Sequence, residues 1–139
     1  MKAHYDTIGR GYSNSRCTDP KIFALLERQL GEAQHILNIG AGTGSYEPED
    51  RQVTALEPSM TMIAQRPSGA APVVQAVAEA MPFPNRSFDA AMGILTLHHW
   101  QHWQSGLMEA SRVSGNRVLL LTWIGFRLVT HWSSPSSPR

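Results

Sequence analysis

The chain has 139 residues, a formal net charge of +1 and 42% hydrophobic residues. This length suits one domain with a real core and is too short for two full domains. Lys and Arg are scattered singly, so no basic run indicates a nucleic-acid partner. No apolar run approaches the length of a membrane span, and the polar N-terminus lacks the apolar centre of a signal peptide. We therefore expect a cytoplasmic protein that binds neither nucleic acid nor a membrane.

The predicted elements alternate between helices and strands. In chain order they are a helix over 20–30, a strand over 35–39, a short helix or loop after residues 40–44, a strand over 53–57, a helix over 60–65, a short strand over 72–76, a strand over 88–95, a helix over 101–113 and a strand over 117–123. Asp19 can cap the first helix and Gly31 can end it. The alternation predicts the α/β class with a mostly parallel sheet.

The two ends of the chain differ from this pattern. Residues 1–18 are rich in Gly, Ser, Asn and Tyr and are typical of an irregular lead-in. Residues 124–139 end in a Ser/Pro-rich run and are predicted to be a disordered tail, so the folded domain is expected to span 1–123. Cys17 is the only cysteine, which excludes an internal disulfide and a cysteine-based zinc site, and we expect no metal.

Two of the predicted strands end in residues suited to binding a nucleoside. The strand over 35–39 runs into a Gly-x-Gly-x-Gly loop at 40–44, and the strand over 53–57 ends in Glu57. Glycines let backbone approach a ligand where a Cβ would collide. A carboxylate can accept hydrogen bonds from both hydroxyls of a ribose. The pair predicts a nucleoside-binding crevice at the carboxyl ends of parallel strands, and a plain turn without a ligand is the alternative.

The residue after the loop narrows the ligand. A dinucleotide fingerprint requires Gly at position 45, where the helix packs against the strand, but this chain has Ser45. The loop is better suited to a ligand without phosphate whose amino-acid portion lies against the backbone, such as S-adenosyl-L-methionine. An NAD-dependent oxidoreductase remains a less favoured interpretation.

The order of the motifs resembles that of a known family. The motifs are Leu37–Gly44, Leu56–Met60, Ala78–Phe83, Ser87–Asp89 and Leu97–Trp100. Between about Tyr5 and Trp123 the chain resembles class I S-adenosylmethionine-dependent methyltransferases of the small-molecule type. The resemblance implies a Rossmann-like, mostly parallel sheet of about five strands with helices on both faces. It also implies methyl transfer from S-adenosyl-L-methionine to a small-molecule acceptor.

The resemblance also implies which residues bind the cofactor. They are Gly40, Ala41, Gly42 and Gly44 of the loop, the first three along the methionine portion; Glu57 at the ribose; Pro58, Ser59 and Met60 beside the adenine; Ala78 and Glu79 at the adenine edge; Ile94 and Leu95 at the sulfonium; and Tyr5, Tyr12 and Arg16 in the lead-in that covers the cofactor.

The chain departs from the family pattern in three places. Asn38 stands where many members have Asp, and Val77 stands where many have a polar residue. The family fold continues after the fifth strand with a helix and an antiparallel strand pair, which we expect this chain to lack. An exposed apolar edge at Val118–Leu121 would then invite a homodimer. A truncated cofactor-binding module with weak or no catalysis is therefore the alternative function.

Several other side chains are candidates for chemistry or for structure. His98 and His99 follow the fourth strand, where a histidine could take a proton from an acceptor hydroxyl or amine. The alternative is that one packs and the other caps the next helix. We expect Asp89 to anchor backbone, Arg112 to pair with a carboxylate, and Trp103 to face inward.

Overall fold

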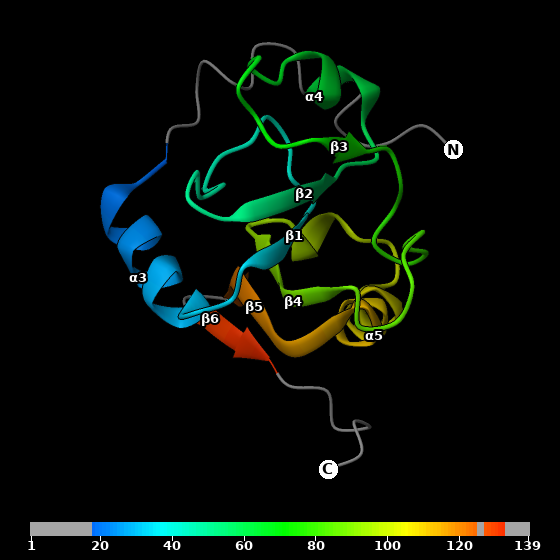
Figure 1. Cartoon of the computed structure of the whole chain (residues 1–139). Coiled ribbons are helices and arrows are strands. Elements are labelled where there is room, and N and C mark those ends of the chain that lie inside the picture. Colours follow the sequence, from blue (N-terminus) through cyan, green and yellow to red (C-terminus); the bar gives the residue numbers. More distant parts are fainter. Residues whose placement is uncertain (1–17, 125–126, 133–139) are drawn as a thin grey trace.

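The computed structural model describes residues 18–124 and 127–132 (Figure 1). Within these ranges the elements are α3 (Pro20–Leu30), β1 (His35–Ile39), β2 (Gln52–Leu56), α4 (Met60–Ala64), β3 (Val73–Val74), β4 (Phe88–Ile94), the short 3-10 helix η1 (Leu97–His99), α5 (Trp103–Val113), β5 (Ser114–Ile124) and β6 (Arg127–Trp132). The predicted α/β alternation is confirmed, with boundaries moved by a few residues. Tyr5, Tyr12, Arg16, Cys17 and the rest of the lead-in up to residue 17 lie outside the described residues.

The strands of the described part form a single sheet in the order β3-β2-β1-β4-β5-β6. β1 lies between β2 and β4 and is parallel to both. The chain builds outward from β1 through β2 and β3 on one side, and through β4 and β5 on the other. Such a reversal of strand order opens a crevice at the carboxyl ends of the central strands, which is where ligands bind in open α/β sheets.

Helices cover both faces of the sheet, as predicted (Figure 1). Successive side chains of a strand point to opposite faces. In β1, Ile36 packs in the cluster that includes Leu26 and Leu30 of α3, whereas Leu37 packs in the cluster that includes Leu107 of α5. Both residues are fully buried. The strands are apolar at successive positions because their side chains pack into a hydrophobic core on each face of the sheet.

The helix ends follow the predicted chemistry in α3 and depart from it in α5. The Asp19 carboxylate accepts a hydrogen bond from the Lys21 N–H at 2.8 Å, and Gly31 closes the helix with φ 56°. α5 starts at Trp103, whose side chain is 48% exposed, so its predicted inward position is wrong. The partly buried ring of Trp100 packs against α5, since a Cβ on Gly106 would lie 2.5 Å from its Cε3.

Strand β6 contradicts two predictions, the disordered tail over 124–139 and the exposed sheet edge at Val118–Leu121. β6 pairs antiparallel with β5, so β5 is covered and is not the exposed edge. The assignment of residues 124–139 to a disordered tail is wrong for Ile124, the last residue of β5, and for 127–132. Residues 125–126 and 133–139 lie outside the described residues. The Ser/Pro composition that suggested disorder is confined to those last residues, and Val129, Thr130 and Trp132 favour a strand.

The connection between β1 and β2 contains no helix. Parallel neighbours are joined by a crossover of a dozen or more residues, which is usually helical. Here residues 40–51 form a series of turns instead. Tyr46 anchors them: it is buried, has φ 66°, and its hydroxyl oxygen accepts a hydrogen bond from the Asp19 N–H at 2.9 Å. The turns therefore pack against the start of α3.

Candidate functional site

The loop after β1 packs directly against the segment after β4. Gly40 has φ 64°, and a Cβ built on it would lie 2.0 Å from the Thr96 Oγ1. Only glycine combines this backbone conformation with such a close neighbour. The sequence motif therefore has a structural cause at Gly40 in addition to any ligand.

Gly42 and Glu57, which were predicted to share one crevice, are in contact. The Gly42 N–H donates to the Glu57 Oε1 at 2.8 Å, and the Ser59 N–H donates to the Oε2 at 2.8 Å. The Ala41 N–H also donates to the Leu56 carbonyl at 3.0 Å. Glu57 is 3% exposed. Its carboxylate therefore ties the glycine loop to the start of α4.

This arrangement places a buried carboxylate beside the glycine loop, as a nucleoside site requires. A carboxylate offers about four acceptor positions, and here both of its oxygens accept from backbone N–H groups. Gly42 has φ 57° and a Cβ there would lie 3.0 Å from the Met62 Cε, so this position favours glycine and lies close against α4. A carboxylate beside a glycine loop is the pairing that the ribose of a nucleoside requires, while the Ala41, Gly42 and Gly44 N–H groups donate within the protein.

The residues assigned to the adenine have mixed surroundings. Ser59 is fully buried and caps α4, because its Oγ accepts from the Met62 N–H at 3.2 Å. Met60 is 54% exposed beside it, and Ala78 is buried. The Glu79 Oε2 accepts from the His102 N–H at 2.8 Å, so in this structure Glu79 holds the start of α5.

The end of β4 and the segment after it carry the proposed sulfonium and catalytic residues. Ile94 is buried, and Leu95 has φ 53° while its N–H donates to the Leu121 carbonyl. His98 and His99 follow on η1, with ring centroids 3.9 Å apart and planes inclined by 47°. The alternative in which one of them caps the next helix is wrong, because the N-cap of α5 is His102.

Sequence reasoning missed two charged residues beneath the loop. Glu47 and Arg66 form an ion pair with N–O distances of 2.9 and 3.0 Å, and their side chains are only 7% and 5% exposed. The Arg66 Nη1 donates to the Gly42 carbonyl at 3.2 Å, and the Asn38 Nδ2 donates to the Glu47 Oε2 at 2.8 Å. The sequence signal that could have indicated them is the short connection over 40–51. A connection without a helix needs other contacts to hold its turns in place.

The two structural roles predicted outside the crevice are confirmed. The Asp89 Oδ2 accepts from the N–H groups of His35 and Gln34, each at 2.9 Å. These backbone bonds, that from His35 first, lower the pKa of Asp89. Arg112 pairs with Glu109, and its hydrogen bond to the carboxylate lowers the pKa of Glu109 and raises that of Arg112.

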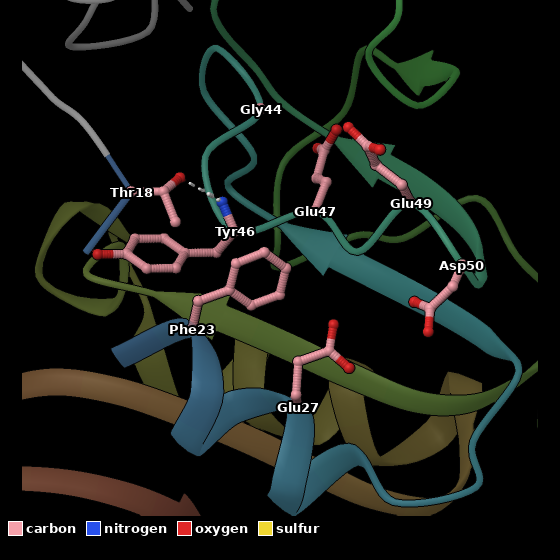
Figure 2. Close-up of a pocket in the computed structure, with 8 residues that line it drawn as sticks. All are labelled: Thr18, Phe23, Glu27, Gly44, Tyr46, Glu47, Glu49 and Asp50. Atoms are coloured by element: carbon pink, nitrogen blue, oxygen red, sulfur yellow. Dashed lines mark hydrogen bonds between the residues drawn. The ribbon is translucent and has the colours of Figure 1, made fainter. Parts of the chain in front are cut away.

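A hollow of about 550 Å³ opens between α3 and the turns after the loop. Figure 2 shows the residues that line it, which are Thr18, Phe23, Glu27, Gly44, Tyr46, Glu47, Glu49 and Asp50. Three of its four acidic residues lie near arginines: Glu27 and Asp50 near Arg51, and Glu47 beside Arg66.

In the ranges that the structure covers, no group of three or more His, Cys, Asp or Glu could hold a metal ion. None of the helices described there is long and apolar enough to cross a membrane.

Known proteins share this sequence pattern and fold. The methyltransferase domain family matches residues 37–120, which is more than half of the chain. The chain is 29% identical over 120 residues to an uncharacterised protein of Methanocaldococcus jannaschii, a match that covers 81% of this chain and 47% of that protein.

Solved structures give the same result. A protein of Anabaena variabilis described as a putative methyltransferase from an antibiotic biosynthesis pathway is 30% identical, with a TM-score of 0.71 over 77% of this chain and 47% of that one. A Thermotoga maritima protein described as a methyltransferase, possibly a histamine N-methyltransferase, is 23% identical, with a TM-score of 0.72 over 84% of this chain and 58% of that one. The chain thus spans about half the length of these relatives. It belongs to the methyltransferase domain family of class I S-adenosylmethionine-dependent methyltransferases.

Proposed function

We propose that the chain binds S-adenosyl-L-methionine at the Gly40–Gly44 loop and Glu57 and transfers its methyl group to a small-molecule acceptor. The observation that carries the proposal is the hydrogen bond between the Gly42 N–H and the Glu57 carboxylate. It joins a glycine loop and an acid at the carboxyl ends of two adjacent parallel strands. When bound, the cofactor supplies a methyl group already activated by the sulfonium.

The protein then has to position the methyl group toward the acceptor and to shield the reacting atoms from water. The loop backbone holds the methionine portion and Glu57 holds the ribose hydroxyls, so the methyl group is oriented toward the acceptor. Orientation of this kind can supply on the order of 7–11 kcal/mol of the barrier. Ile94 and Leu95 keep the surroundings of the sulfonium apolar and exclude water. His98 or His99 accepts the proton of an acceptor hydroxyl or amine where one must be lost.

The binding step is tested by calorimetry with S-adenosylhomocysteine. We expect wild-type protein to bind and Glu57→Gln to bind at least tenfold more weakly, because a hydrogen bond to a charged group contributes about 1.5–3 kcal/mol. Glu32→Gln is the matched control, since it also removes one carboxylate charge but lies exposed in the turn before β1. Equal affinity in wild-type and Glu57→Gln protein would refute the assignment of the ribose site.

The catalytic step is tested by measuring S-adenosylhomocysteine formation against a panel of hydroxyl and amine acceptors. Product formation that falls in His98→Ala or His99→Ala, with cofactor affinity retained, supports transfer with a general base. Tight binding with no product from any acceptor favours the alternative, a cofactor-binding module. Preferential binding of NADH would instead revive the oxidoreductase interpretation.

A further inference from the structure

We propose that Glu47 and Arg66 are positioning residues that set the shape of the cofactor loop from beneath, in place of the crossover helix that this chain lacks. The inference rests on the proposed function, because it concerns the loop that would hold S-adenosyl-L-methionine. Neither residue belongs to the glycine motif or to the acid at the end of β2.

Gly42 is held on both sides by a buried charged group. Its N–H donates to the Glu57 Oε1 at 2.8 Å, and its carbonyl accepts from the Arg66 Nη1 at 3.2 Å. With φ 57° and no side chain, Gly42 would otherwise have wide conformational freedom. The two contacts fix the orientation of both peptide groups that flank this glycine.

Glu47 connects this support to the rest of the sheet. Its Oε2 accepts from the Asn38 Nδ2 at 2.8 Å, and its Oε1 accepts from the Ala71 N–H at 3.1 Å. Arg66 donates to both carboxylate oxygens and to the Ala71 carbonyl at 2.8 Å. One ion pair thus joins the end of β1, the cofactor loop and the segment before β3.

The use of a charged pair at Glu47 and Arg66 indicates that these residues position the loop and do more than fill space beside it. A buried ion pair gains little stability over apolar residues of similar volume, because desolvation offsets the attraction. Apolar residues could not donate to the Gly42 carbonyl or accept from Asn38. The planar arginine fork can reach a carboxylate and neighbouring carbonyls at once, which a lysine ammonium does not reproduce.

The test compares Arg66→Lys with Arg51→Lys. Arg51 is a matched control, because its side chain is also buried, at 9% exposed, and also forms an ion pair, with Glu27 at 3.2 Å. It donates to the Ala33 carbonyl at 2.7 Å, and neither Glu27 nor Ala33 belongs to the 40–44 loop. Two readouts are used: amide hydrogen exchange at Gly42 without ligand, and calorimetric affinity for S-adenosylhomocysteine. We expect Arg66→Lys to exchange at least tenfold faster and to bind at least tenfold more weakly. Arg51→Lys should stay within twofold of wild type in both.

The outcomes separate this inference from the proposed function. If Arg66→Lys has the same amide exchange rate at Gly42 and the same affinity for S-adenosylhomocysteine as wild-type protein, the positioning role is refuted. If wild-type protein does not bind S-adenosylhomocysteine, the proposed function fails, while the exchange at Gly42 still tests the support of the loop. If Arg66→Lys does not fold, the paired variant Glu47→Leu/Arg66→Met leaves no unpaired buried charge. It should fold with the same faster exchange, and unchanged exchange there would equally refute the role.

Discussion

Gly40→Ala tests whether the glycine loop is shaped by its own packing as well as by a ligand. The new Cβ would lie 2.0 Å from the Thr96 Oγ1 and 2.7 Å from the Thr96 Cβ. The backbone at φ 64° adds about 1–2 kcal/mol for any residue other than glycine. Overpacking adds about 1–3 kcal/mol. We therefore expect a loss of roughly 2–5 kcal/mol in the free energy of unfolding, measured by urea denaturation.

A double mutant separates the two causes. In Gly40→Ala/Thr96→Gly the steric conflict is gone but the strained backbone remains. Thr96→Gly alone carries its own cost, because the Trp100 Nε1 loses the Oγ1 acceptor at 3.2 Å. We expect the two changes to be non-additive by about 1–3 kcal/mol, with the double mutant more stable than the sum of the single losses predicts.

Gly69→Ala is the control, since a Cβ there meets nothing within 4 Å. It should change the free energy of unfolding by no more than about 0.5 kcal/mol. A Gly40→Ala loss as small as that of Gly69→Ala would refute the contact between the loop and Thr96. Strict additivity in the double mutant would mean that Thr96 is not the residue responsible.

Three further predictions concern stability. Leu37→Ala, in a fully buried side chain of the central strand, should lower the free energy of unfolding by about 2–5 kcal/mol in urea denaturation. Ser59→Ala removes the cap of α4 and should cost about 0.5–2 kcal/mol in the same assay. The backbone bonds to Asp89 lower its pKa below the ordinary 3.8, so its stabilisation is present above that pH and is lost as the pH falls through the folded pKa. Wild-type protein should therefore lose stability more steeply than Asp89→Asn below about pH 3.8 in acid titrations followed by circular dichroism, and parallel curves would contradict this.

Local chemistry made much of the fold predictable. The cap at Asp19 and the stop at Gly31 act within one turn of α3, so they are visible in the sequence. Strand β5 was visible because Val118 and Leu119 serve opposite cores and must both be apolar. The contact between Gly42 and Glu57 followed from the rule that parallel strands end at one edge of the sheet.

The missed features depend on contacts between distant parts of the chain. The Glu47–Arg66 pair joins residues 19 positions apart, and neither residue has a neighbour in sequence that indicates burial of its charge. The exposure of Trp103 and the packing of Trp100 against Gly106 depend on where α5 begins, which a single helical period does not define. The pairing of β6 with β5 required a strand that the composition of the last residues had obscured.

The two roles of Glu57 affect how its variant must be interpreted. Its carboxylate shapes the loop by accepting from Gly42 and Ser59, and in the proposed function it also holds the ribose. Glu57→Gln therefore changes the loop and the ribose contact together. Arg66→Lys loosens the same loop through the Gly42 carbonyl while leaving the Glu57 carboxylate in the chain. Where the two variants show similar rates of amide exchange at Gly42, we expect Glu57→Gln to weaken cofactor binding more than Arg66→Lys does. The difference in binding free energy then measures the ribose contact. Equal losses would mean that Glu57 acts on the cofactor only through the loop.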